Sequence, residues 1–387
     1  MFQRVLRRLG LGLFFVNVFA FSVTPSIAQA ANRESAFSTS IVASPSPGNV
    51  ANHLSNVVSL SASDAWAVGG ATSAVGHPAQ LQTRPLIVRW DGATWRTVKS
   101  GVFGAAALSG IAAVTSHNIW AVGHQGPNEG GTPLIEHWNG SAWSVVPSPA
   151  ILDGYLLGVS AVGADDIWAV GIRVGLVSYS LIEHWNGSRW RAVDSPNPGV
   201  EYNEIDSVVA IAHNNAWAVG FSISNNISRP LLSRWNGSRW SVVRSPATGM
   251  QNNLLRSVAA VSKDDVWAVG QSRSIDGSRV KTLVEHFDGR GWHVVPSPSP
   301  TPQTWLIGVA VHGDEVWAVG VRVDGFTTRT LMLHGEQGQL NAIATANRGG
   351  DGNMLEAVIA SHGIVWAVGS NQAQTKGESL VLRARIE

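Results

Sequence analysis

Short apolar runs alternate with polar turns along most of the chain. In one representative stretch the apolar runs occupy residues 257–262, 266–270, 283–287 and 292–295. Runs of this length that are rich in Val and Trp and bounded by Asp, Gly and Pro are typical of β-strands. No convincing 3.6-residue apolar period, the signature of an amphipathic helix, occurs after residue 30. The stretch therefore predicts four short strands, named a to d in chain order.

The second of these strands carries a repeated signature, Trp-Ala-Val-Gly. The spacings between successive copies are 54, 48, 49, 50, 50 and 49 residues, and the tryptophans are Trp66, Trp120, Trp168, Trp217, Trp267, Trp317 and Trp366. A near-constant period of about 50 residues indicates a repeat array. Seven units of four antiparallel strands predict an all-β fold, a single seven-bladed β-propeller over residues 31–387. Because neighbouring blades cover one another's faces, we expect the repeated tryptophans to form the core between blades.

The two ends of the repeat region complement each other. The last copy stops after its third strand, near Ile386. Residues 41–47 resemble residues 294–298, which form the fourth strand of the fifth copy and its Pro-Ser tail. We therefore expect residues 38–48 to supply the outer strand of the last blade, which leaves no half-built blade with an open edge.

The first thirty residues have a different pattern. Three arginines within the first eight residues precede the apolar run 9–23, and Ala28-Gln29-Ala30 has the small-x-small form of a cleavage site. This pattern predicts a signal peptide over residues 1–30 and a secreted protein, extracellular or in the cell envelope. The alternative is an uncleaved anchor, but the apolar run of about 15 residues is short for a bilayer. No later run is long enough to span one.

Charge and cysteine content exclude several kinds of functional site and ligand. The chain has no cysteine, which excludes disulfides, thiolate metal sites and a cysteine nucleophile. Without the three arginines of the signal peptide, 24 basic residues face 26 acidic ones, a net charge of −2 before histidine. No basic field then points to nucleic acid or to an anionic membrane. We expect no cofactor and a monomer.

The repeats resemble those of kelch and galactose-oxidase-type propellers, and they are also similar to Trp-rich repeats of bacterial secreted propellers. The resemblance rests on Trp-Ala-Val-Gly followed by L-x-x-[HR]-[WF]-[ND]-G-x-x-W. Trp stands where kelch repeats usually have Tyr, and the double glycine of the kelch pattern occurs after strand b only at Gly69-Gly70. Galactose-oxidase chemistry is not implied, because that family cross-links a cysteine to a tyrosine. The chain has no sialidase boxes either.

A histidine precedes the aromatic residue of strand c in four copies: His137, His184, His286 and His334. The neighbouring glutamates, as in Glu136-His137, could suggest a metal site. Adjacent residues on a strand point to opposite sides, however, and do not converge on one ion. We therefore expect a repeated packing or hydrogen-bonding role and no metal.

A functional site is expected where the repeat varies. Since strand direction alternates, the d–a and b–c connections share one end of the disc, which we call the variable face. A constant Leu or Ile stands just before each strand a, and its neighbours differ between copies. We expect these neighbours to ring the mouth of the central channel. The candidate ligand-binding residues are Tyr155, Glu204, Asp206, Arg256, Trp305 and Glu356.

These residues favour a non-enzymatic binding or interaction module. Carbohydrate is the first expected ligand, because an exposed Trp or Tyr beside carboxylates suits a sugar ring; a protein partner is the second. The rival is a hydrolase using Glu204, Asp206 or Glu356 as acid and base. That mechanism needs two carboxylates about 5–10 Å apart across a pocket. A solvated rim without a ligand is the remaining alternative. We assign no catalytic residue.

Overall fold

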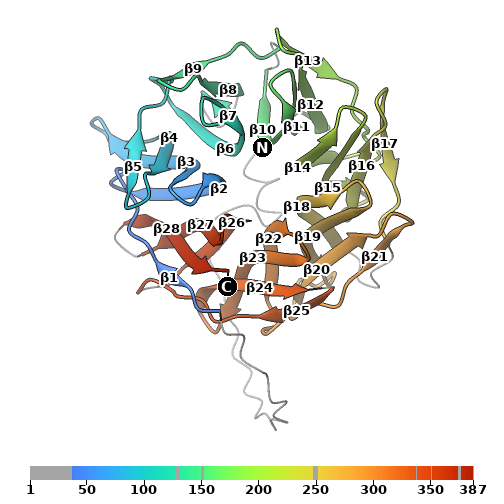
Figure 1. Ribbon diagram of the computed structural model, residues 1–387. Helices are drawn as coiled ribbons and strands as arrows, with labels where there is room; N and C mark the ends of the chain where they lie inside the picture. The colour runs from blue at the N-terminus through green and yellow to red at the C-terminus, as the bar shows by residue number, and fades with distance from the viewer. Residues whose placement is uncertain are drawn as a thin grey trace. The chain divides into compact units, whose positions relative to one another are not determined.

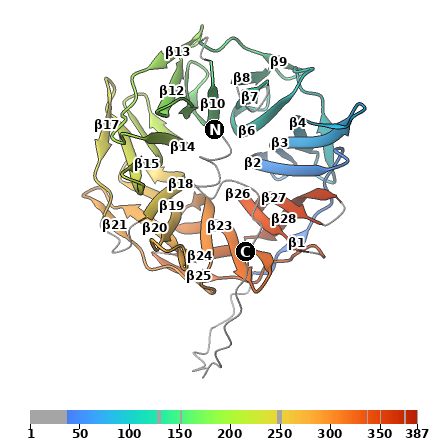
Figure 2. The same cartoon turned by 180° about the vertical axis from the view of Figure 1, so that it is seen from behind.

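A computed structural model describes residues 37–126, 131–149, 152–246, 252–336, 338–349, 351–373 and 376–386. Within these ranges the chain forms 28 β-strands in seven four-stranded antiparallel sheets, arranged as blades around a common axis (Figures 1 and 2). The predicted all-β, seven-bladed propeller is confirmed. The described part contains no helix long and apolar enough to cross a bilayer. The predicted signal peptide, residues 1–30, lies outside the described residues.

Each blade runs from an inner to an outer strand. In chain order the blades are β2 (Ala51–Ser61), β3 (Asp64–Val75), β4 (Gln80–Trp90) and β5 (Trp95–Val98); β6 (Ala106–Thr115), β7 (Asn118–Gln125), β8 (Thr132–Trp138) and β9 (Trp143–Val145); β10 (Gly154–Gly163), β11 (Asp166–Arg173), β12 (Tyr179–Trp185) and β13 (Trp190–Val193); β14 (Tyr202–Ala212), β15 (Asn215–Ser224), β16 (Ile227–Trp235) and β17 (Trp240–Val243); β18 (Asn252–Ser262), β19 (Asp265–Arg273), β20 (Val280–Phe287) and β21 (Trp292–Val294); β22 (Thr304–His312), β23 (Glu315–Asp324), β24 (Thr327–Glu336) and β25 (Gln339–Ala342); and β26 (Asn353–Ser361), β27 (Ile364–Gln372), β28 (Gly377–Arg385) and β1 (Ser40–Ile41).

The last blade is closed by the amino-terminal segment, as predicted. Strand β1 pairs antiparallel with β28, with Ser40 opposite Arg383. The two strands lie side by side in Figure 1. The strand proper spans only two residues of the predicted range 38–48. Beyond it, the Val42 amide donates to the Val381 carbonyl at 2.9 Å, and Ser44 and Ser46 hydrogen-bond to the Ser379 hydroxyl. The outer position is thus held by side chains as well as by the sheet.

The repeated tryptophans fill the interfaces between blades. The seven b-strand tryptophans are between 0 and 4% exposed. Trp66 meets Trp138 and Trp143 of the next blade with ring centroids 5.0 and 5.8 Å apart. Trp366 meets Trp90 and Trp95 of the first blade in the same way, at 5.0 and 5.2 Å, and so joins the ring. The core prediction is confirmed for these residues, although Trp185 and Trp235 of strand c are only partly buried.

Two interfaces replace the usual tryptophan pair. In the sixth blade Leu340 packs in the same cluster as Trp267 of the fifth blade, which stays 4% exposed. In the seventh blade Phe37 lies edge-on to Trp317, with centroids 5.3 Å apart. The amino-terminal segment therefore supplies an aromatic side chain as well as a strand to the interface that it closes.

The strand-c histidines have the predicted packing and hydrogen-bonding role. His184 stacks on Trp168 at 4.2 Å, and its Nε2 lies 2.8 Å from Asp166 Oδ1 at the start of strand b. His286 repeats this arrangement with Trp267 and Asp265. Where arginine takes the histidine position the function is similar: Arg383 lies 5.3 Å from the Trp366 ring centroid.

The glutamate next to each of three such histidines points the other way and is buried. Glu136, Glu183 and Glu285 are 0% exposed. Each accepts a hydrogen bond from a serine of the connection that arrives from the preceding blade, as Glu183 does from Ser148 at 3.0 Å. Burial raises the pKa of Glu183 and of Glu285 to about 7, opposed by these serine bonds. The carboxyl groups therefore tie each connection to the next blade and resist ionisation there.

Candidate ligand-binding site at the inner strands

Every inner strand contains a β-bulge at the constant Leu or Ile. In β14, Ile205 pairs with Gly220 and Ser207 with Val219, which leaves Asp206 as the extra residue. The same shift occurs in all seven inner strands, and the extra residues are Ser55, Ser109, Leu157, Asp206, Arg256, Ile307 and Glu356. Bulges re-aim side chains and are frequent beside functional sites. Placing these residues in a loop before strand a was wrong: β18 begins at Asn252, within the predicted connection.

This bulge requires the glycine of Trp-Ala-Val-Gly. The glycine pairs with the constant Leu or Ile just before the extra residue, where the carbonyl oxygen of the residue preceding that Leu or Ile approaches closely. A Cβ on Gly220 would lie 2.0 Å from the Glu204 oxygen, and the corresponding distance is 1.9–2.1 Å in all seven copies. Only glycine allows two backbones to approach so closely. The repeated motif thus secures the conformation that presents the variable residues.

Three of the predicted site residues form one ion cluster between two blades. Arg256, on β18, donates from Nη1 to Asp206 Oδ1 at 2.7 Å and to Glu204 Oε1 at 3.5 Å. Both acids lie on β14 of the neighbouring blade. The Tyr202 hydroxyl donates to Glu204 Oε2. We call Tyr202, Glu204, Asp206 and Arg256 the axial cluster.

An aromatic side chain, Phe221, packs against two members of the cluster. The Phe221 ring stacks with Tyr202 at 5.4 Å, and the Arg256 guanidinium carbon lies 5.3 Å from its centroid. The other nitrogens of Arg256 make no hydrogen bond to the described residues. Its side chain is 17% exposed, against 7% and 11% for Glu204 and Asp206. The guanidinium is therefore the charged part of the cluster that solvent reaches most.

Burial sets the protonation of the cluster. It raises the pKa of Glu204, with the Asp206 charge adding to the effect, and so favours the neutral form of Glu204. Burial also raises the pKa of Asp206, but the Arg256 charge opposes this. Asp206 Oδ2 is buried and has no hydrogen-bond partner among the described residues.

The other predicted residues lie in neighbouring blades, outside the axial cluster. Glu356 on β26 interacts with His53 and accepts a bond from Ser55, both on β2, and burial raises its pKa. Tyr155 on β10 contacts the His124 ring at 4.9 Å. Trp305 occupies the equivalent position on β22 and is partly exposed. The inner strands β10, β14, β18, β22 and β26 follow one another around the axis (Figure 1), so these side chains occupy five consecutive blades at the same level.

Sequence reasoning missed two contributors. Tyr202 precedes Glu204 by two residues on β14 and therefore shares its side of the strand, a signal that period-two alternation offered. His124 directly follows the Gly of the second Trp-Ala-Val-Gly copy and pairs with Ala107, and burial lowers its pKa. Its place beside Tyr155 of the next blade depends on the packing between blades, which the sequence does not give.

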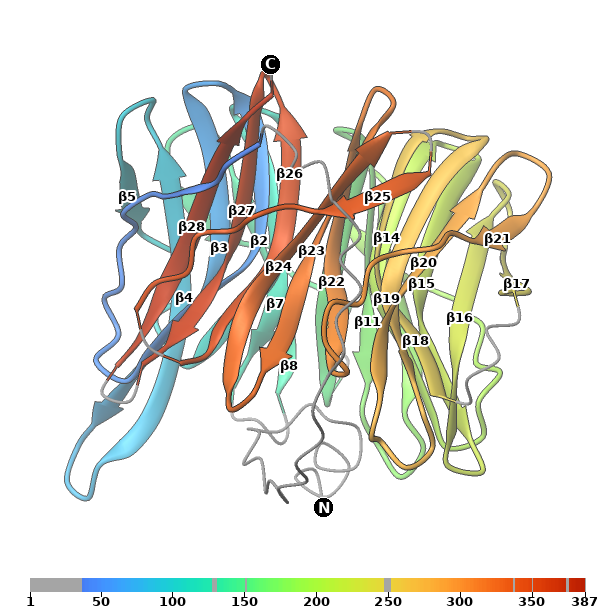
Figure 3. The same ribbon diagram turned by 90° about the horizontal axis from the view of Figure 1, so that it is seen from below.

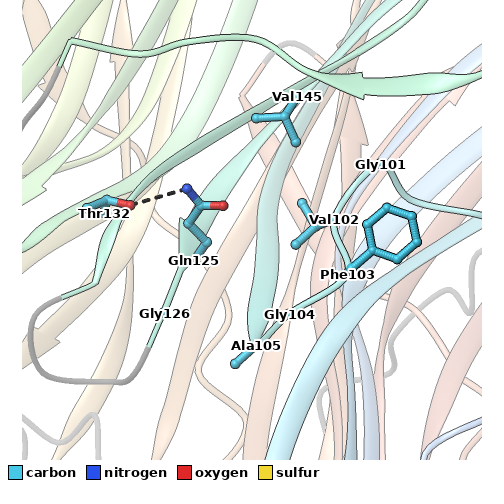
Figure 4. A pocket seen from close by; sticks show the side chains of 9 residues that line it. All are labelled: Gly101, Val102, Phe103, Gly104, Ala105, Gln125, Gly126, Thr132 and Val145. Atoms are coloured by element: carbon cyan, nitrogen blue, oxygen red, sulfur yellow. Dashed lines mark hydrogen bonds between the residues drawn. The ribbon is translucent and has the colours of Figure 1, made fainter.

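A separate shallow groove of about 500 Å³ lies near the second blade, on the connection between β5 and β6 (Figure 4). Its polar side chains bond to each other, Gln125 Nε2 to Thr132 Oγ1 at 3.4 Å. The Phe103 ring projects away from that pair in Figure 4, and Lys99 lies 5.1 Å from its centroid. None of the described residues that line the groove has an ionisable side chain, so it is a weaker candidate for specific recognition than the axial cluster.

The cluster does not have the geometry of a hydrolase pair. Glu204 and Asp206 lie two residues apart on one strand and bind the same arginine. A glycosidase pair instead faces its partner across a substrate, about 5–10 Å away. Among the described residues, no group of three His, Asp or Glu side chains converges as a metal site would require. The arrangement suits fixed charge and hydrogen-bond recognition better than acid–base chemistry.

No protein-family model and no curated protein matches the chain. Solved structures share its fold at low identity. One is YCF48 bound to a D1 peptide, with 14% identity, a TM-score of 0.56, and coverage of 92% of this chain and 97% of that one. The WD40 propeller of Doa1 has 12% identity, a TM-score of 0.55 and coverage of 90% and 98%. An ulvan lyase of family PL25, bound to an oligosaccharide, has 10% identity, a TM-score of 0.55 and coverage of 86% and 94%.

These similarities establish the propeller and do not select one family within it. The kelch or galactose-oxidase type of repeat stays a prediction.

Proposed function

We propose that the protein is a secreted, non-enzymatic binding protein. It binds a carbohydrate where the inner strands reach the variable face. The observation that carries the proposal is the axial cluster. Seven bulges present variable side chains at one level, and one pair of blades there holds a fixed, partly exposed guanidinium. Partly exposed Tyr155 and Trp305 lie on the blades at either side.

This combination matches what a sugar offers. Hydroxyl and carboxylate groups of a saccharide accept hydrogen bonds from the unused nitrogens of Arg256, and its apolar ring faces stack on indole or phenol rings. The neutral Glu204 adds no repulsion toward an acidic sugar. The solved propellers of similar fold include a polysaccharide lyase, which supports carbohydrate as a ligand class without identifying the ligand.

A protein or peptide partner is the second candidate. It is favoured by the similar fold of YCF48, which was solved with a peptide bound, and by the same exposed arginine, which can pair with a peptide carboxylate. A hydrolase stays the third alternative, and the pair of Glu204 and Asp206, which bind the same arginine on one strand, gives it no support.

The test is a glycan array, neutral and acidic, probed with residues 31–387, followed by calorimetric titration of the best ligand. We expect Trp305→Ala to weaken binding about tenfold or more, because a stacked ring contributes up to about 1.5 kcal/mol beyond the apolar area that it buries, and about 1.4 kcal/mol is a factor of ten. Trp235→Ala is the matched control, since Trp235 packs against Trp168 and Trp240 away from the site. It should lower stability and leave affinity unchanged. An array without any specific ligand would rule out carbohydrate, and a peptide library would then test the second candidate.

A further inference from the structure

The b–c connections of the variable face expose large apolar side chains at corresponding places. Five of these connections are described completely, in blades one, three, four, five and six. Four of them carry such a residue at or beside the tip: Leu81 is 71% exposed, Leu176 95%, Ile275 68% and Phe326 77%. The fourth blade instead makes a tight turn with Asn225 and Asn226 at positive φ.

The pattern is confined to one end of the propeller. Figure 3 shows the β3–β4 and β23–β24 hairpins reaching the lower end, away from the end of β28. At the opposite end, among the described residues, the exposed large apolar side chains are Val162 and Val261, at 41% and 47%. Single exposed apolar residues are ordinary on protein surfaces. Their recurrence at one end of four different blades is not explained by folding, because none of the four is in the core.

The hairpins of strands b and c that carry these tips are basic, mostly through residues near the strand ends. Between the Gly of each Trp-Ala-Val-Gly and the Leu of the following strand c, the sequence contains nine Lys or Arg and four Asp or Glu. Of the 24 basic and 26 acidic residues after residue 30, this leaves 15 and 22 elsewhere. A net charge near zero thus hides two regions of opposite sign. The fifth blade shows the combination clearly, with Ile275 among Arg273, Arg279 and Lys281.

From this placement we propose that the b–c tips dock the propeller onto an anionic lipid bilayer. Apolar tips in blades one, three, five and six lie around the disc, so a small ligand would not reach them together, whereas a flat surface would. A bilayer offers apolar material just below anionic head groups, which is the partner that exposed apolar residues flanked by Lys and Arg fit. The charge excess on these hairpins is the reason to favour anionic lipid over a second copy, because two copies of a basic face repel each other.

The experiment is vesicle co-sedimentation of residues 31–387 at low salt. Vesicles of phosphatidylcholine alone are compared with an equal mixture of phosphatidylcholine and phosphatidylglycerol. Wild type should bind the mixed vesicles, bind neutral ones much less, and be released by salt. The double variants Leu176→Ser with Phe326→Ser, and Arg279→Ala with Lys281→Ala, should each weaken binding about tenfold or more. Val162→Ser with Val261→Ser at the opposite end is the matched control and should bind like wild type.

Three results would overturn the proposal. One is wild type that ignores the mixed vesicles, and another is tip variants that bind them as well as the control. The third is self-association in sedimentation velocity that the Leu176 and Phe326 changes abolish without any vesicle binding, which would assign the tips to a second copy. Because all substituted side chains are exposed, thermal melts should be unchanged. Glycan binding is a separate readout, so the two proposals fail independently.

Discussion

Replacing one glycine of the repeat with alanine probes the bulge that presents the site. A Cβ at Gly220 would lie 2.0 Å from the Glu204 carbonyl oxygen and 2.8 Å from the Ile205 Cα. Both neighbours are backbone atoms, so no side-chain rotation relieves the overlap. Overpacking of this kind costs about 1–3 kcal/mol, with the upper end expected where backbone must move. The entropic gain of Gly→Ala, about 0.4–1 kcal/mol, offsets only part of it.

We therefore expect Gly220→Ala to lower the free energy of unfolding by about 2 kcal/mol. The measurement is urea unfolding monitored by tryptophan fluorescence. The midpoints of wild type and variant are compared, and the dependence of the unfolding free energy on urea concentration is checked for change. Gly291→Ala is the matched control, because nothing lies within 4 Å of its Cβ position. The control should be neutral or slightly stabilising. Equal midpoints for the two variants would refute the idea that close approach at the bulge requires this glycine.

Other predictions concern closure, core and pH. Deleting residues 32–49 removes β1 and should lower the melting temperature strongly, so an unchanged melt would contradict the strand exchange. Trp190→Ala should cost about 3–5 kcal/mol in denaturant unfolding; a loss below about 1 kcal/mol would place Trp190 outside the core. Burial raises the folded pKa of Glu183 and Glu285 from 4.5 to about 7, so the folded state binds the extra protons and stability should fall as pH rises from 5 to 8. Replacing both with Gln should flatten that dependence, and an equally steep profile in the variant would assign it to other groups.

The architecture was predictable because it repeats. The period of Trp-Ala-Val-Gly predicted the number of blades, and the Pro-Ser tail that residues 41–47 share with the fourth strand of the fifth copy predicted the closing strand. Both signals are local in sequence and need no knowledge of packing. The burial of the b-strand tryptophans followed from the same logic, since a four-stranded sheet must have both faces covered. The two substituted interfaces could not be predicted in this way, because nothing in the sequence shows that Phe37 contacts Trp317.

The site was predictable only in part. Glu204, Asp206 and Arg256 were selected because they vary beside a constant residue, and the structure joins them. Their presentation by a bulge could not be inferred, because register depends on which residue lacks a partner on the neighbouring strand. Because the register was unknown, the Gly of Trp-Ala-Val-Gly could be assigned only to the end of the predicted second strand. The segregation of charge was also hidden, since net charge says nothing about which end of a disc each residue occupies.

If the bulged inner strands hold the ligand-binding site, affinity must depend on the side chains that they present. Calorimetric titration of one array-selected glycan against wild type, Trp305→Ala and Trp235→Ala, with a melting curve for each, tests this. We predict about tenfold or greater loss of affinity for Trp305→Ala at little cost in stability, and the opposite pattern for Trp235→Ala. Wild-type affinity in a folded Trp305→Ala protein would contradict the claim and move the site away from the inner strands.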